Sequence, residues 1–168
     1  MNRGLPKFRQ PLRPPQFAAV CACFIMLALT GCADEKRQFA EKTTDKAVAQ
    51  ILDDTEFAIS ERNFRINNRL HIGKAIRERG QSGFPDYEVI LFCNLSYAKK
   101  MLELAPDFIS YCPYRITIRD TGQHRIITAS LLPNETPSKL LNAVTGEINS
   151  LVWEIVDFAA KDWPDLNE

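Results

Sequence analysis

A strand-to-helix junction near the middle of the chain constrains the fold more than any other feature. Residues 87–93, Tyr-Glu-Val-Ile-Leu-Phe-Cys, form a nearly continuous apolar run, which is typical of a strand near the centre of its sheet. Asn94 follows directly, and Asn is among the best N-cap residues. Residues 95–104 then carry apolar side chains at helical spacing. The sequence therefore predicts a central strand that passes straight into a capped helix.

The other segments alternate between helical and strand patterns. We expect a helix over 45–62, a strand over 64–72, a short helix over 74–79, a hairpin formed by 114–119 and 124–131, and a long helix from a Thr136 cap and Pro137, with a possible break at Thr145-Gly146. This order predicts an α+β fold in which helices pack on one face of a mainly antiparallel sheet.

The strand over 64–72 alternates strictly between apolar and polar residues. This period predicts a half-buried strand, with Arg65, Arg69 and His71 on one outward face. That face is a candidate contact for anionic groups such as lipid phosphates. A solvated outer face is the alternative interpretation.

The first 31 residues are typical of a secretory signal. Four basic residues and no acidic residue accompany an apolar run over 17–30, which is shorter than the about 20 residues of a spanning helix. The run ends in Leu29-Thr30-Gly31-Cys32, which resembles the lipobox of bacterial lipoproteins. That resemblance implies cleavage before Cys32 and acylation of this cysteine.

Four regions follow from this assignment. They are a signal peptide (1–31), an acylated Cys32 with a polar tether (32–44), a single α+β domain (45–163) and a tail (164–168). Because each buried CH₂ contributes about 0.8 kcal/mol, more than one acyl chain anchors a domain almost permanently in membrane lipid. By the sorting rule of enterobacterial lipoproteins, Ala33 implies an outer-membrane anchor with the domain facing the periplasm.

Cleavage of the signal would make the protein acidic. The whole chain has 21 basic and 21 acidic residues, and the part from Cys32 onward keeps 17 basic and 21 acidic residues, a net charge of −4. Nucleic-acid-binding domains are generally basic. We therefore expect no nucleic-acid partner.

The sequence resembles the bacterial family known as domain of unknown function 302 over roughly residues 47–160. The motifs that carry the resemblance are Glu88-Val89-Ile90-Leu91-Phe92-Cys93-Asn94, Ala98 with Leu102, Cys112-Pro113-Tyr114-Arg115-Ile116, the hairpin end Leu131-Leu132-Pro133, and the segment 69–76. Family members often have Pro-Cys where this chain has Cys112 before Pro113. The resemblance implies a curved sheet with two main helices, like half of the TATA-binding protein, and frequent homodimers. It implies no established activity.

Cys93 and Cys112 would remain in the domain, in an oxidising compartment. Cys93 precedes a helix N-terminus, which we expect to lower its thiol pKa. Three interpretations stay open: a structural disulfide, two unrelated buried thiols, and a reactive redox or metal site. Asn94 and Arg115 complete this candidate ligand or redox site, with helix capping as the alternative role of Asn94.

Motifs of known enzyme classes are absent from the sequence, including the P-loop, the dinucleotide-binding glycines, GxSxG, HExxH and SxxK. His71 and His124 have no metal-site spacing, so we expect no metal and no cofactor. The preferred hypothesis is a non-enzymatic, lipid-anchored domain that binds a small ligand or a partner protein. The alternatives are a redox or metal-handling protein that uses Cys93 and Cys112, and a structural homodimeric lipoprotein.

Overall fold

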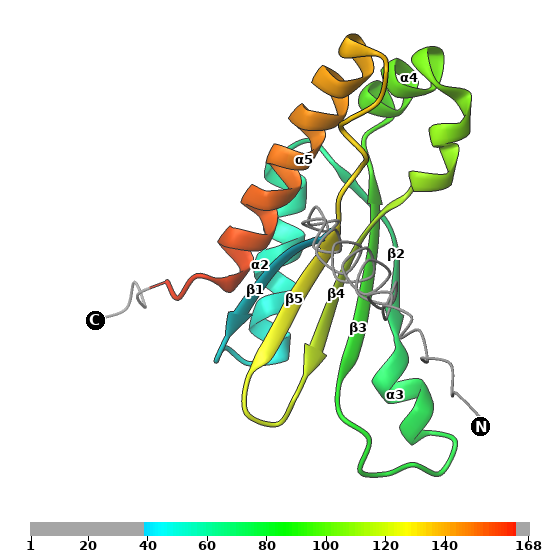
Figure 1. Ribbon diagram of the computed structural model, residues 1–168. Coiled ribbons are helices and arrows are strands. Elements are labelled where there is room, and N and C mark those ends of the chain that lie inside the picture. The colour runs from blue at the N-terminus through cyan, green and yellow to red at the C-terminus, as the bar shows by residue number, and fades with distance from the viewer. Residues whose placement is uncertain (1–38, 164–168) are drawn as a thin grey trace, which may run out of the picture. The chain divides into compact units, whose positions relative to one another are not determined.

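An open, five-stranded antiparallel sheet organises the protein in the computed structural model, which describes residues 39–163 (Figure 1). The strands lie in the order β1 (Phe39–Thr44), β5 (Arg125–Ser130), β4 (Tyr114–Asp120), β3 (Tyr87–Cys93) and β2 (Arg65–His71). Every neighbouring pair is antiparallel. The predicted α+β class with an antiparallel sheet is therefore confirmed.

Two long helices, α2 (Val48–Glu61) and α5 (Lys139–Ala160), cover one face of the sheet and pack against each other. The shorter elements lie at the two ends of the strands: α3 (Ile72–Arg77) at one end, and α4 (Leu95–Leu104) with the 3-10 helix η2 (Pro106–Tyr111) at the other (Figure 1). Fully buried side chains between the helices and the sheet form the core, among them Ile51, Ile59, Ile90, Phe92, Ile116, Ile118, Ile127, Ile148 and Ile155. Burial of each such side chain stabilises the fold by about 1.5–3 kcal/mol.

The domain begins earlier than the sequence suggests. Residues 39–44, assigned above to the tether, form β1 and pair with β5 along the whole strand. Glu41, Lys42 and two threonines leave this strand with little apolar periodicity. Charged residues are common on edge strands because they discourage pairing with other chains. A strand of this composition lacks the alternation of apolar and polar residues by which strands are predicted from a sequence.

A bulge in β2 reverses the direction of its later side chains. The register between β2 and β3 shifts between Ile66 and Asn68. Directly paired residues point to the same face, so Arg69 lies on the helix-covered face with its partner Ile90, and Arg65 lies on the open face with its partner Cys93. The prediction that Arg65, Arg69 and His71 share one outward face is therefore wrong, because one extra residue changes the alternation.

The long helix α5 differs from the expectation at its start and in its middle. It runs without a break through Thr145 and Gly146. Its N-cap is Ser138, whose Oγ accepts a hydrogen bond from the Leu141 N–H at 3.2 Å. Thr136 instead donates both its N–H and its hydroxyl to the Asn142 side-chain oxygen.

Candidate functional site

Two thiols meet at the end of the sheet that α4 and η2 cover. Cys93 is the last residue of β3, and Cys112 follows η2 just before β4. Their Sγ atoms lie 3.0 Å apart, and both cysteines are free thiols. The interpretation as two unrelated buried thiols is therefore wrong. A disulfide bond is about 2.05 Å long, so an approach of about 1 Å would join the two sulfurs.

The antiparallel pairing of β3 and β4 brings these thiols together. Phe92 and Tyr114 are direct partners in the sheet, so Cys93, which follows Phe92, lies level with the residues just before β4. The chain between them leaves the sheet through α4 and η2 and returns at Cys112, whose peptide bond to Pro113 is cis. The fold thus brings together two cysteines that are 19 residues apart in the sequence.

Burial determines the acidity of Cys93, which is 6% exposed. Desolvation raises the pKa of the Cys93 thiol to about 12, and the hydrogen bond and charge of Cys112 act in the same direction. The backbone N–H of Asn94 lowers the pKa, but this effect is smaller. The expectation of a lowered pKa is therefore wrong, and Cys93 is a protonated thiol at neutral pH.

A pocket of about 300 Å³ lies beside Cys112 on the open face of the sheet. Its lining combines strand residues with the end of η2 and the segment after β5: Leu91, Ser110, Tyr111, Cys112, Pro113, Tyr114, Arg115, Ser130, Leu131 and Leu132. Arg115 pairs with Leu91 across the sheet and donates a 3.4 Å hydrogen bond to the Ser130 hydroxyl. Cys112, the less buried thiol of the pair, thus opens into a partly apolar pocket with one cation at its wall.

An aromatic cluster supports the thiols from the helix side of the sheet. The Phe64 ring contacts the rings of Phe92, Tyr97 and Tyr114 at centroid distances of 5.5–6.2 Å. The Tyr114 hydroxyl is buried without a hydrogen-bond partner in the described part of the chain. Burial, followed by the nearby thiols, raises the pKa of Tyr114, so the phenol stays neutral. This packing holds the end of β4 firmly against β3.

Asn94 acts as the cap of α4. Its side-chain oxygen accepts hydrogen bonds from the N–H groups of Ser96 at 2.9 Å and Tyr97 at 3.2 Å. Its amide nitrogen donates to the Asn63 carbonyl at 2.9 Å. Asn63 itself has a positive φ of 59°, which Asn tolerates better than most residues. These bonds use both ends of the Asn94 amide to fix the junction that positions Cys93.

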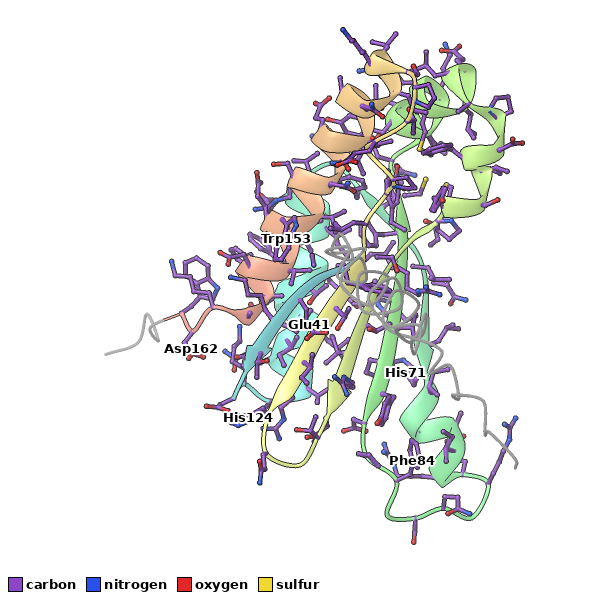
Figure 2. The ribbon with its side chains drawn as sticks, in the orientation of Figure 1. Glu41, His71, Phe84, His124, Trp153 and Asp162 are labelled. Carbon is purple, nitrogen blue, oxygen red and sulfur yellow. The ribbon has the colours of Figure 1, made fainter. Side chains whose placement is uncertain are left out.

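The other sequence-predicted residues lie apart from the thiols. Arg69 forms an ion pair and a hydrogen bond with Glu56 of α2, and the hydrogen bond raises the pKa of Arg69. His71 Nδ1 lies 2.6 Å from the buried carboxylate of Glu88, at the α3 end of β2 (Figure 2). Arg65 is the exception, because it pairs with Cys93 in the sheet. Of the three, only Arg65 lies at the thiol end of the open face.

Two further properties concern residues 39–163 alone. They contain no cluster of three or more His, Cys, Asp or Glu side chains that would hold a metal ion. None of their helices combines the length and the apolar composition needed to cross a bilayer.

Cys93, Cys112 and Arg115 were predicted from the sequence as site residues, whereas Tyr111, Ser130 and Leu131 of the pocket were not. Ser130 and Leu131 end the predicted hairpin, and Tyr111 precedes Cys112. Only their positions beside predicted strand ends and beside Cys112 in the sequence could have indicated that they belong to the pocket.

Fold and site together define an α+β domain with an open antiparallel sheet and a thiol pair at one sheet end. The chain belongs to the family described as domain of unknown function DUF302, whose model matches residues 40–151. It is similar to the crystal structure of an uncharacterized conserved protein DUF302 from Bacillus stearothermophilus, with a TM-score of 0.66 and 11% sequence identity over 74% of this chain and 99% of that chain. At this identity the likeness shows the fold alone. A comparison with curated proteins finds no match.

Proposed function

We propose that this protein is a lipid-anchored domain of the cell envelope whose Cys93–Cys112 pair cycles between two thiols and a disulfide. The observation that carries the proposal is the 3.0 Å Sγ–Sγ contact, in which one sulfur is buried and the other lines a pocket. Oxidation forms the S–S bond and releases two protons and two electrons. The electrons reduce the disulfide of an incoming partner molecule.

The N-terminal sequence supports the anchor. The basic start, the apolar run over 17–30 and Leu29-Thr30-Gly31-Cys32 favour acylation of Cys32, and Ala33 favours the outer membrane. Only residues 33–38 separate Cys32 from the first residue of β1, so this connection spans at most about 25 Å. The thiol pair would therefore work close to a membrane surface in an oxidising compartment.

Binding of a small ligand, the preferred hypothesis from the sequence, fits the same place. The pocket beside Cys112 has apolar walls from Leu91 and Leu131 and a guanidinium from Arg115. Small-molecule sites commonly combine apolar walls with a few placed polar groups. Ligand binding and thiol chemistry thus belong to one site in this proposal.

The cycle is tested on the full-length, acylated protein in detergent. We expect the oxidant diamide to produce an intramolecular Cys93–Cys112 disulfide, detected as the loss of two alkylatable thiols by mass spectrometry, and dithiothreitol to restore both thiols. A redox-active pair has a reduction potential above about −300 mV, whereas a structural disulfide lies below it. Cys93→Ser and Cys112→Ser serve as controls, because neither can form the intramolecular bond.

Two results would contradict this proposal. One is that both thiols stay alkylatable under excess diamide. The other is a disulfide that the folded protein keeps against a glutathione buffer, since such a bond is structural and does not cycle.

A further inference from the structure

We infer that the partner of the thiol pair is a small anionic disulfide, represented by oxidised glutathione, whose carboxylate Arg115 binds. This inference rests on the proposed thiol cycle and adds the class of its substrate. Three observations support it: the positive charge of the arginines near the thiols, the volume of the pocket, and the greater exposure of Cys112 than of Cys93.

The charge argument concerns arginines without a carboxylate partner. The Arg115 guanidinium forms no ion pair within residues 39–163, and its one hydrogen bond to a described residue is the 3.4 Å bond to the Ser130 hydroxyl. By contrast, four arginines each pair with an acidic side chain: Arg62, Arg69, Arg77 and Arg125. A guanidinium matches a carboxylate with two parallel hydrogen bonds. The planar donor group of Arg115 is therefore available for an anionic ligand.

The surroundings of Arg115 favour the same charge. The residues that line the pocket include no acidic side chain. Arg65, directly opposite Cys93 in the sheet register, lies on the same open face and likewise has no ion pair among the described residues. A cationic disulfide would meet two uncompensated arginines at this end of the sheet, whereas an anionic one would meet two partners.

The size of the pocket favours a small molecule. Its volume of about 300 Å³ is at the lower end of the range of about 300–1,000 Å³ for small-molecule sites. Tyr111 and Leu131 provide apolar contact, and Ser110 and Ser130 provide hydroxyl groups. A short peptide that carries a disulfide and carboxylates uses all of these features.

The exposure of the sulfurs sets the order of the reaction. Cys112 lines the pocket, so its thiolate attacks one sulfur of the disulfide RS–SR, and one RSH leaves after taking up a proton. The product is a mixed disulfide on Cys112. The Cys93 thiol, 3.0 Å away, then loses its proton and attacks the Cys112 sulfur, which expels the second RSH. In total, the protein dithiol is oxidised to a disulfide and RSSR is reduced to two RSH.

The test measures mixed-disulfide formation in the Cys93→Ser background of the full-length, acylated chain, where the first step cannot proceed further. Oxidised glutathione is compared with cystamine, a small disulfide that carries amines and no carboxylate. We expect Arg115→Gln to slow the reaction with oxidised glutathione by about tenfold, since a charge-assisted bidentate contact is lost. The reaction with cystamine should not slow, which also shows that the variant is folded.

Arg119→Gln is the matched control. Arg119 lies on the same strand and face as Arg115, four residues further along β4 and outside the pocket lining, at a distance of about 13 Å. We expect this variant to react with oxidised glutathione at the rate of the Cys93→Ser parent. Arg115→Lys should restore part of the lost rate, because it returns the charge without the planar donor group.

The possible failures are distinguishable. Equal slowing by Arg115→Gln and Arg119→Gln, or equal slowing with both disulfides, would overturn the role of Arg115. If diamide closes the Cys93–Cys112 bond but oxidised glutathione forms no mixed disulfide, the substrate class is wrong while the thiol cycle stands. If diamide also fails, the thiol cycle itself is wrong.

Discussion

Two opposing effects act on the thiol of Cys93. The N–H of Asn94, at the start of α4, stabilises a thiolate and lowers the pKa, whereas burial destabilises the thiolate and raises the pKa to about 12. Burial prevails because the Cys93 side chain is almost completely enclosed, with Cys112 as its near neighbour. A position next to a helix N-terminus can be read from the sequence, but the degree of enclosure cannot.

This balance predicts how fast Cys93 is alkylated. We expect iodoacetamide labelling of Cys93 to accelerate about tenfold per pH unit between about pH 7 and 10, because the thiolate fraction rises in proportion when the pH is below the pKa. Peptide-resolved mass spectrometry separates Cys93 from the other cysteines. In the denatured chain, labelling should level off above about pH 8.5. A similar plateau in the folded protein would show that burial does not control this thiol.

Local order in the sequence was enough to place some of the candidate residues near one another. Cys93, Cys112 and Arg115 flank predicted strand ends, and neighbouring strand ends meet in an antiparallel sheet. It was not enough for Arg69 and His71, whose partners Glu56 and Glu88 come from other elements. No pattern within residues 64–72 predicts that Arg69 and His71 pair with carboxylates from other elements.

At the level of elements, the predicted types were largely correct, and the errors have local causes. The bulge in β2 adds one residue to a segment that still alternates in sequence, so the period alone places its second half on the wrong face. The polar edge strand β1 has no apolar stripe. In α5, Thr145 and Gly146 resemble a helix break, but tertiary burial of Leu141, Ile148 and Val152 holds the helix together.

Two glycines test how the helices are built. Gly146 lies inside α5, and an added Cβ would meet nothing within 4 Å, so Gly146→Ala should raise the free energy of unfolding by about 0.5–1 kcal/mol through better helix propensity. At Gly73 of α3 an added Cβ would lie 2.4 Å from the Pro85 carbonyl oxygen and 2.7 Å from the Tyr87 nitrogen. Gly73→Ala should therefore lower the free energy of unfolding by about 1–3 kcal/mol, because the backbone must shift to make room for the methyl group.

Urea unfolding followed by circular dichroism measures both changes. Gly83→Ala is the control, because Gly83 lies in the loop before β3 and an added Cβ there also meets nothing within 4 Å. It should change the free energy of unfolding by less than Gly73→Ala. A destabilised Gly146→Ala variant would mean that α5 does bend or break at this position.

For the whole molecule, the important relation is between the start of the domain and the thiol site. Phe39, the first residue of β1, pairs with Ser130, and Ser130 lines the pocket beside Cys112. β1 therefore begins at the end of the sheet where the thiols lie, which is the end nearer to α4 (Figure 1). An acylated Cys32 would hold this end within about 25 Å of the membrane. The homodimer implied by the family resemblance stays a prediction, and the thiol chemistry does not depend on it.

The anchor leads to the last prediction, which uses the three cysteines of the N-terminal segment as a matched set. Wild-type protein should incorporate a palmitate analogue and fractionate with the outer membrane. Cys32→Ala should lose the label and accumulate as a longer precursor that retains residues 1–31, because the acylated side chain is required before a lipoprotein signal is removed. Membrane fractionation, label incorporation and the mass of the N-terminal peptide measure these outcomes.

Cys21→Ala and Cys23→Ala are the controls for this experiment. Both residues lie inside the apolar run rather than at its end, so neither substitution should change labelling, processing or fractionation. If Cys32→Ala is still processed and stays on the membrane, the anchor is not an acyl chain on Cys32. In that case the 25 Å limit on the distance between the thiol pair and the membrane no longer holds, since the limit counts residues from Cys32 to Phe39. The chemistry of Cys93 and Cys112 would then have to be tested without assuming a nearby membrane.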